Sequence, residues 1–392
     1  MKAKTFILTF LMMLSSFAFG QATQGLHWAV ENPTQYQDPL IVYAGVTLDG
    51  TVQTNTNLEL GAFCGDEVRG SVKLQLQAGI NKVIAYLSVY SNNPNDIITF
   101  KLYNHENEKT YNNTLSPIRF GDYYNGTHNT IGSVKDNYVV SFATIAEVNG
   151  EIYDALQAAI DACVAGDNTV TLLANISDDV TVKQVEGVNI IINGDNNEYS
   201  GTFYIHGNAR SNGAETLTFK NVNFTTSEAS HYFIDSNETT SAERYAHNVT
   251  VEGCNFTATG DAKNTAVAMR IRQGFNIAIN GGIFTDLHSA LQAYGNDGIT
   301  VTGITLTGKN GISAGTSNDV VITNSNITAT GYGVRADGTG AYDMTLEGNT
   351  IKANNPIIVR KTTGAYELTV NNCQLTVNKV ADSINKKVTK LS

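Results

Sequence analysis

Arginine, tyrosine and aspartate residues recur on one strand of a repeated unit in the C-terminal half of the sequence. The stretches AMRIRQ from Ala268, ALQAYG from Ala290 and GVRADG from Gly333 alternate apolar and polar residues. Alternate side chains of a strand point to opposite faces, so apolar residues that point inward leave their neighbours outward. We call these neighbours the outward lane. The lane comprises Tyr204, His206, Phe233, Asp235, Arg270, Arg272, Gln292, Tyr294, Ser313, Arg335, Asp337 and Arg360.

The residue types in this lane are suited to carbohydrate. A guanidinium group can hold a carboxylate or sulfate through two parallel hydrogen bonds, and an aromatic ring can stack on a sugar ring. The sequence therefore predicts a polysaccharide or surface glycan as the partner. The predicted ligand-binding residues are Arg270, Arg272, Gln292, Tyr294, Arg335, Asp337 and Arg360. A solvated face with ordinary ion pairs between strands is the alternative that the pattern leaves open.

Signals for catalysis are sparser. Asp286 and His288 in FTDLHS could form a hydrogen-bonded acid-base pair, and Arg270 could act as the base of a lyase. Hydrolases of the polygalacturonase kind use clustered carboxylates, and Asp178-Asp179 is the only paired aspartate in the sequence. A noncatalytic binding protein is thus the leading hypothesis. A polysaccharide lyase or glycoside hydrolase acting on acidic polysaccharide is its alternative.

The sequence predicts neither a metal site nor a cofactor. Cys64, Cys163, Cys254 and Cys373 lie far apart and without the spacing of zinc ligands, so we expect free thiols. Calcium could be attracted by acidic residues in the turn GDNNEYSG from Gly194, but nothing else supports it. An excess of acidic over basic residues makes nucleic acid an improbable partner.

One apolar phrase recurs along the chain and predicts the architecture that positions the lane. Its copies are VNIIING from Val188, LTFKNVNF from Leu217, VTVEGCNF from Val249, IAINGGIF from Ile277, ITVTGITL from Ile299, VVITNSNI from Val320, MTLEGNTI from Met344 and LTVNNCQL from Leu368. After the first copy they begin 21 to 32 residues apart, which is the length of one solenoid coil. Each copy bends at Asn or Gly, which tolerate a positive φ. The sequence predicts a parallel β-helix with at least two strands per coil.

These repeats resemble the right-handed parallel β-helix superfamily that includes pectate lyases and polygalacturonases. The resemblance covers about 230 residues and implies the fold and its right-handedness, whereas it does not imply an activity. Before the repeats, EIYDALQAAIDACVAGD from Glu151 has apolar residues at helical spacing and predicts a short α-helix that caps the first coil.

A different pattern precedes the repeats. Short alternating strands separated by turn signals, such as the stretch from Leu40 to Gly50, predict an antiparallel, Ig-like β-sandwich over residues 21–145. Trp28, the motif LGAFCGDEVRG from Leu60 and ITFKLYN from Ile97 resemble a β-sandwich module of secreted Bacteroidetes proteins. The charged residues of LGAFCGDEVRG indicate a structural ion pair rather than a binding or catalytic site. The whole chain is therefore expected to be all-β.

Export is predicted by the first residues. Lys2 and Lys4 precede an apolar run that is too short to span a membrane, and small residues follow it. Residues 1–20 are thus expected to be a signal peptide, residues 146–378 the β-helix with its cap, and residues 379–392 a polar tail. No cysteine follows the cleavage point, so a secreted or cell-surface protein is expected rather than a lipoprotein or a membrane-spanning protein. Asp382-Ser383-Ile384 in the tail fits a short O-glycosylation pattern of Bacteroidetes.

Overall fold

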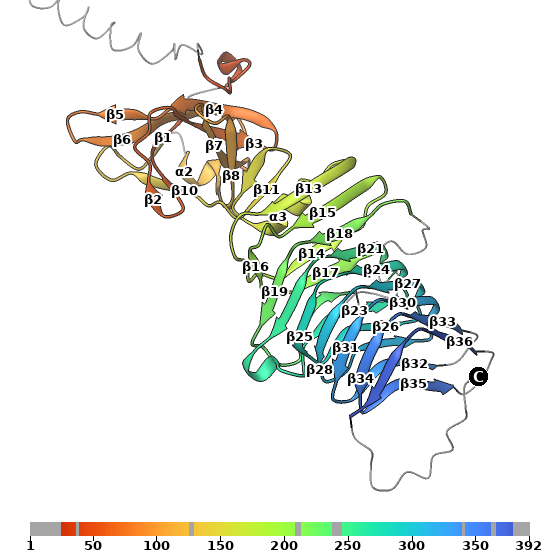
Figure 1. The fold of residues 1–392 in the computed structure, drawn as a ribbon. Helices are drawn as coiled ribbons and strands as arrows, with labels where there is room; N and C mark the ends of the chain where they lie inside the picture. Colours follow the sequence, from red (N-terminus) through yellow and green to blue (C-terminus); the bar gives the residue numbers. More distant parts are fainter. Residues whose placement is uncertain are drawn as a thin grey trace, which may run out of the picture. The chain divides into compact units, whose positions relative to one another are not determined.

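The computed structural model describes residues 25–36, 39–124, 129–207, 213–236, 245–338, 342–361 and 366–378. The predicted signal peptide and the polar tail with its glycosylation pattern lie outside the described residues, so both remain predictions. The chain divides into two compact units between Ala143 and Thr144 (Figure 1). No helix in the described ranges is long and apolar enough to cross a membrane.

The N-terminal unit contains two sheets whose strands are mostly antiparallel. One sheet has the order β10-β1-β6-β5, with β2 and β9 also paired to β1, and the other has the order β8-β7-β3-β4. The strands are β1 (Leu40–Leu48), β2 (Thr51–Val52), β3 (Leu58–Cys64), β4 (Glu67–Lys73), β5 (Gln75–Gln77), β6 (Lys82–Val89), β7 (Ile97–Asn104), β8 (Lys109–Arg119), β9 (Thr130–Ile131) and β10 (Tyr138–Phe142), with the short helices η1 (Pro33–Gln35) and α2 (Phe120–Tyr123). Alternate residues of β1, such as Leu40 and Val42, are fully buried. This confirms the expected antiparallel N-terminal architecture.

A buried carboxylate fixes the first described residues to this unit. Glu59 is fully buried and accepts hydrogen bonds from the backbone N–H groups of His27 at 2.6 Å and Trp28 at 3.0 Å. The His105 ring contacts the same carboxylate at 2.8 Å. The motif Asp66 to Gly70 is also structural, because Arg69 forms ion pairs with Glu67 and Asp96.

The C-terminal unit winds three strands per coil into three parallel sheets (Figure 1). Sheet 1 consists of β13 (Gly166–Leu172), β15 (Val188–Asn193), β18 (Leu217–Lys220), β21 (His247–Glu252), β24 (Phe275–Asn280), β27 (Asp297–Thr302), β30 (Asn318–Thr323), β33 (Tyr342–Glu347) and β36 (Tyr366–Asn371). Sheet 2 consists of β16 (Glu198–Tyr199), β19 (Asn223–Thr226), β22 (Asn255–Ala258), β25 (Ile283–Leu287), β28 (Thr305–Gly308), β31 (Asn326–Ala329), β34 (Thr350–Ala353) and β37 (Gln374–Val377). Sheet 3 consists of β14 (Val180–Lys183), β17 (Phe203–His206), β20 (Tyr232–Asp235), β23 (Val267–Arg272), β26 (Ser289–Tyr294), β29 (Ile312–Gly315), β32 (Tyr332–Gly338) and β35 (Asn355–Lys361).

The recurring phrase lies in one register along the solenoid. Leu217 pairs with Val249, Val249 with Ile277, and Ile277 with Ile299. All four are buried in a single continuous core. Phenylalanines stack under sheet 2, where the ring of Phe256 lies 4.4 Å from that of Phe224 between centroids. The parallel β-helix and its repeat are therefore confirmed, and each coil has one strand more than the minimum that the sequence indicated.

The bend between sheets 1 and 2 is made by residues with a positive φ in successive coils. They are Asn221, Gly253, Gly281, Gly303, Asn324, Gly348 and Asn372, with φ between 50° and 71°. Asn and Gly recur there because other residues adopt this conformation at a cost. Just beyond the bend, Asn255 Nδ2 donates to Asn223 Oδ1 of the preceding coil at 3.0 Å.

The region before the first coil differs from its prediction. Residues Glu151–Tyr153 form strand β12, which pairs with β11 (Ala146–Val148) as a hairpin through Asn149-Gly150. Helix α3 is therefore short, Leu156–Asp161, and ends well before Gly166. Its residues Leu156, Ala159 and Ile160 are buried in the core of the β-helix, so α3 does cover the first coil. The four cysteines are free.

Candidate binding groove

Sheet 3 presents two outward columns of side chains that contain most of the outward lane. In the first column Asp235 pairs in register with Arg270, Arg270 with Gln292, Gln292 with Ser313, and Ser313 with Arg335. The second column brings Arg272 beside Tyr294 and Asp337 beside Arg360. The expected inward residues between them are buried. These are Met269, Ile271, Leu291, Ala293, Ile312, Ala314, Val334 and Ala336.

A groove of about 620 Å³ lies over strands β23, β26, β29 and β32. Gly315 provides its depth, since it stands in the second column beside Tyr294 without a side chain. A Cβ atom at Gly315 would lie 3.2 Å from Tyr294 Cδ2 and 3.2 Å from Asp337 Oδ1. The groove thus has the Tyr294 ring on one side of Gly315 and the Asp337 carboxylate on the other.

Arg270 is held rigidly at one end of the groove. Its Nε donates to Asp235 Oδ1 at 2.8 Å, and its Nη2 donates to Asp235 Oδ2 at 2.6 Å. Its guanidinium also lies 3.7 Å from the centre of the Tyr232 ring. Asp235, which is only 1% exposed, balances the charge of Arg270 from the neighbouring strand. Arg270 is a positioned donor rather than an unpaired cation.

A second arginine-aspartate pair lies at the other end. Arg335 Nε donates to Asp337 Oδ2 at 2.7 Å, and the Arg335 guanidinium lies 5.8 Å from the centre of the Tyr332 ring. Burial lowers the pKa of Arg335, but the hydrogen bond and charge of Asp337 outweigh it, so the pKa is raised overall. Burial also raises the pKa of Tyr332, which keeps its phenol protonated.

Tyr294 and Arg272 form the accessible wall. The Tyr294 side chain is 55% exposed, and the Arg272 guanidinium lies 5.8 Å from the centre of its ring. Among the residues that the structure describes, Arg272 has no carboxylate partner. Arg360 is exposed in the same column but does not line the groove. The groove therefore has a single arginine, Arg272, whose charge is not balanced by a described aspartate.

His288 borders the groove at the corner between sheets 2 and 3. Its Nε2 lies 3.4 Å from Asn310 Nδ2, while Asn310 Oδ1 accepts the backbone N–H of Tyr332 at 3.3 Å. With Oδ1 engaged in this way, Asn310 presents its amide hydrogens to His288 Nε2. Burial lowers the pKa of His288, and the nearby Lys309 ammonium lowers it further. The lowered pKa favours the neutral ring near pH 7.

The expected pair of Asp286 and His288 is not formed. Asp286 forms an ion pair with Lys263 at 2.9 Å, and the ring contacts of His288 are with Ser289, Gln292 and Asn310. Asp286 itself has a positive φ, so the turn between them directs the two side chains to different partners. Asp286 is therefore not part of the groove, whereas His288 is.

Phe233 was wrongly placed in the outward lane. It is fully buried, with its ring 5.6 Å from that of Phe224. Ile234 is buried beside it, and Ile234 pairs with Met269. Two consecutive inward residues break the alternation on which the prediction depended. Tyr204 and His206 lie on β17, one coil before Asp235, and do not line the groove.

Other sequence candidates have structural roles. Asp179 Oδ1 accepts the backbone N–H of Thr202 at 2.7 Å, and the Asp178 carbonyl accepts the Tyr199 hydroxyl. The described residues contain no group of three or more His, Cys, Asp or Glu side chains that could hold a metal ion. Asp195 and Glu198, in the turn from Gly194, therefore do not belong to such a group.

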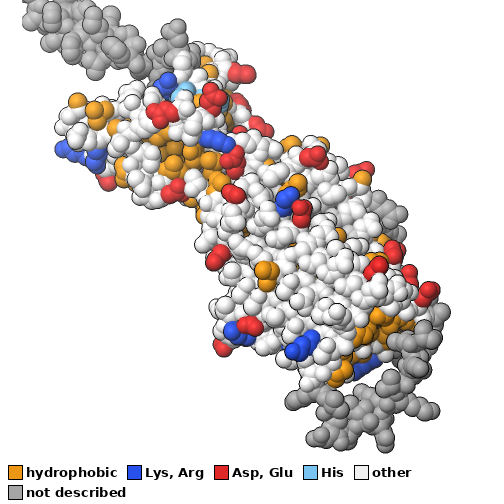
Figure 2. Space-filling model, viewed as in Figure 1, with side chains coloured by type: hydrophobic (Ala, Val, Ile, Leu, Met, Phe, Trp, Pro, Cys, Tyr) orange, Lys and Arg blue, Asp and Glu red, His pale blue; other side chains and the backbone are white. Residues whose placement is uncertain are grey.

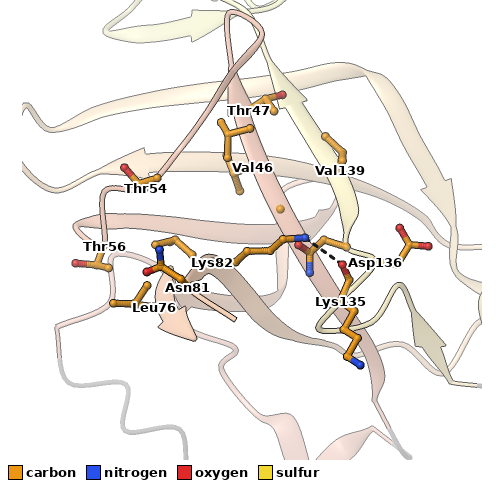
Figure 3. A pocket seen from close by; sticks show the side chains of 14 residues that line it. Val46, Thr47, Thr54, Thr56, Leu76, Asn81, Lys82, Lys135, Asp136 and Val139 are labelled. Atoms are coloured by element: carbon orange, nitrogen blue, oxygen red, sulfur yellow. Dashed lines mark hydrogen bonds between the residues drawn. The ribbon is translucent and has the colours of Figure 1, made fainter. Parts of the chain in front are cut away.

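A second hollow of about 620 Å³ lies in the N-terminal unit (Figure 3). Val52, Leu76 and Val139 line it and are largely exposed. Lys82 crosses it and donates from Nζ to the Lys135 carbonyl at 3.0 Å, which Figure 3 marks with a dashed line. Its aliphatic walls and its lack of arginine and aromatic side chains make it a poorer match to a polar ligand than the groove on sheet 3.

Three comparisons, with models of protein families, with curated proteins and with solved structures, each gave no match. The function must therefore be argued from the groove itself.

Proposed function

We propose that this protein is an exported, noncatalytic β-helix protein that binds glycan in the groove on sheet 3. The observation that carries the proposal is that two tyrosines and two arginines, each arginine held by an aspartate, line one hollow. Planar aromatic faces suit the apolar faces of sugar rings, and fixed donors and acceptors suit their hydroxyls. Secretion, the Bacteroidetes affiliation and the likeness to the pectate-lyase-like superfamily belong to the same proposal.

The charge arrangement favours neutral sugars over acidic ones. Asp235 and Asp337 balance Arg270 and Arg335, so these guanidinium groups offer directed N–H donors with little net positive charge. Asp337, which lines the groove, can also accept hydrogen bonds from sugar hydroxyls. Only Arg272 adds a positive charge that no described carboxylate balances. We therefore expect a neutral, hydroxyl-rich chain with at most one acidic substituent.

A screen of the mature chain against an array of neutral, uronate-containing and sulfated polysaccharides tests the proposal. We expect binding to neutral chains that weakens only slightly with salt, because little net charge is involved. Binding to none of the polysaccharides would overturn the proposal. Binding to sulfated chains alone would overturn the preference for neutral sugars.

A lyase is the second candidate, and His288, which lines the groove together with Tyr332 and whose pKa is lowered, favours it. A lyase needs a base near the α-proton of a uronate and a group that neutralises its carboxylate. Incubation with uronate polysaccharides, followed by ultraviolet absorbance of the unsaturated product, separates the two functions. A hydrolase has less support, because Asp337 is the only carboxylate lining the groove in the described ranges, and glycosidases ordinarily use two.

A further inference from the structure

The sheet that contains β1 opens along one side of that strand. β1 pairs with β6 as far as Ala44, which lies opposite Ala85, and it pairs with β2 from Thr47. Residues 82–84 of β6 pair with β5, on the side of β6 that faces away from β1. An opening is therefore left in the sheet between β1 and the start of β6.

The hollow of about 620 Å³ in the N-terminal unit lies at this opening (Figure 3). Gly45 adds to its depth, because it pairs with Val139 of β10 and has no side chain. Three aliphatic side chains line the hollow and are largely exposed: Val52 at 66%, Leu76 at 56% and Val139 at 56%. Exposed apolar side chains that gather around one hollow indicate a binding surface.

One ammonium group lies in the hollow. Lys82 reaches across it, and its Nζ donates to the Lys135 carbonyl at 3.0 Å (Figure 3). An ammonium group has further N–H donors, so this bond leaves Lys82 able to hold a ligand. Asp136 also lines the hollow, but Lys82 forms no ion pair with a carboxylate in the parts of the chain that the structure describes. The hollow therefore combines apolar walls with one cation.

We propose that this hollow binds a free fatty acid, with the alkyl chain against Val52, Leu76 and Val139 and the carboxylate on Lys82. A fatty acid matches both features of the hollow, because it has a long apolar chain and one terminal anion. Among the described residues that line the hollow none is aromatic, so a flexible alkyl chain suits it better than a flat ring system. Its volume lies in the range of small-ligand sites. The hollow shares no lining residue with the groove on sheet 3, so this proposal does not depend on glycan binding.

Three probes with the same alkyl chain test the role of the carboxylate: decanoate, decanol and decyltrimethylammonium. Each is titrated into the mature chain by calorimetry, below the concentration at which it forms micelles. We expect decanoate to bind about fivefold or more tightly than decanol, because its carboxylate pairs with the Lys82 ammonium, and the cationic probe to bind most weakly. Lys82→Met keeps an apolar side chain and should remove the preference for decanoate over decanol.

Two matched variants test the apolar wall. Leu76→Ser changes a leucine in the hollow, whereas Leu115→Ser changes an exposed leucine of β8 outside it. We expect Leu76→Ser to weaken decanoate binding about fivefold and Leu115→Ser to change it by less than about twofold. Because both leucines are exposed, thermal unfolding of the two variants should match that of the unaltered chain. The proposal would be overturned by no binding of decanoate, by equal binding of all three probes, by a preference for decanoate that survives Lys82→Met, or by equal losses in the two leucine variants.

Discussion

Sheets 2 and 3 belong to the same coils and share one core, yet their outward faces differ. On sheet 2, Thr225, Thr257, Thr285, Thr307 and Thr328 form one column in consecutive coils. None of these hydroxyls has a hydrogen-bond partner in the described parts of the chain. On sheet 3 the corresponding positions hold arginines that contact aspartate or tyrosine, and a glutamine that contacts His288. Most of the C-terminal unit visible in Figure 2 is uncharged.

This difference separates what the fold requires from what it permits. Threonine satisfies an exposed strand position by its β propensity alone. Interlocking guanidinium and carboxylate groups beside a glycine hollow are not needed to complete a coil, because sheet 2 completes the same coils without them. The groove on sheet 3 is therefore the better place to seek a function.

The largest loss of stability should come from a substitution in the core that sheets 2 and 3 share. Phe256→Ala removes a ring that stacks between Phe224 and Phe284. We expect a loss of about 3–5 kcal/mol in the free energy of unfolding, measured by urea denaturation. Thr257→Ala, the outward neighbour, should change it by less than about 0.5 kcal/mol. Equal losses of stability in the two variants would contradict the assignment of Phe256 to the core and of Thr257 to the outer face.

Removing the buried carboxylate of the groove comes next. Asp235→Ala leaves the Arg270 guanidinium, which is 15% exposed, without its bidentate partner. We expect a loss of about 2–3 kcal/mol in the free energy of unfolding. Asp337→Ala breaks the more exposed pair and should cost less than about 1 kcal/mol. Thermal unfolding of both variants checks the order, and a larger loss in Asp337→Ala would contradict the assigned burial.

Filling the hollow should reduce binding. Gly315→Leu adds a side chain between Tyr294 and Asp337, and its Cβ would also lie 3.3 Å from the Asp337 carbonyl oxygen. We expect about tenfold or greater loss of affinity for the neutral polysaccharide selected on the array. Thr307→Leu adds the same side chain to sheet 2 and should leave affinity unchanged. Titration calorimetry of the two variants gives the comparison, and undiminished affinity in Gly315→Leu would exclude the hollow.

The smallest effect should be the pH dependence contributed by His288. Its pKa is depressed in the folded chain relative to the ordinary 6.5, so the unfolded chain binds the proton more readily. The stability from the neutral ring is therefore present above about pH 6.5 and is lost as the pH falls toward the depressed value. His288→Gln should have a flatter melting temperature between about pH 7.5 and about pH 5. A profile unchanged by that substitution would show that His288 does not titrate as inferred.

The periodicity of the sequence was sufficient to predict the solenoid, but it did not predict the side-chain contacts of the groove. The repeated phrase predicts the register from Leu217 to Leu368, because every inner position must be apolar and each bend needs Asn or Gly. It misplaced Phe233, where two adjacent residues point inward and alternation no longer assigns a face. It also extended α3 over Glu151–Tyr153, the second strand of the hairpin that turns at Asn149-Gly150, although Asn-Gly is a strong turn signal.

The hydrogen-bond partners of the groove side chains could not be predicted from the sequence. These partners lie on neighbouring coils, and the spacing of residues in the sequence does not give distances between coils. Arg270 and Asp235 lie 35 residues apart in the sequence, and a lane assigned from strand alternation does not show that they neutralise each other. The Glu59 anchor was missed for the same reason, since its donors at His27 and Trp28 lie 32 and 31 residues before it in the sequence. Gly315 carried a signal that could have been used, because a glycine amid large outward residues marks a hollow.

The most direct test compares two double variants in calorimetric titrations with the best neutral polysaccharide from the array. Tyr294→Ala with Arg335→Gln removes the aromatic wall and one fixed donor, and Thr307→Ala with Thr328→Ala changes sheet 2 to a similar extent. Our account predicts a loss of affinity of about 100-fold for the first, equivalent to about 2.8 kcal/mol. It predicts a change within about twofold for the second. Equal affinities of both variants and the unaltered chain would contradict the assignment of binding to sheet 3.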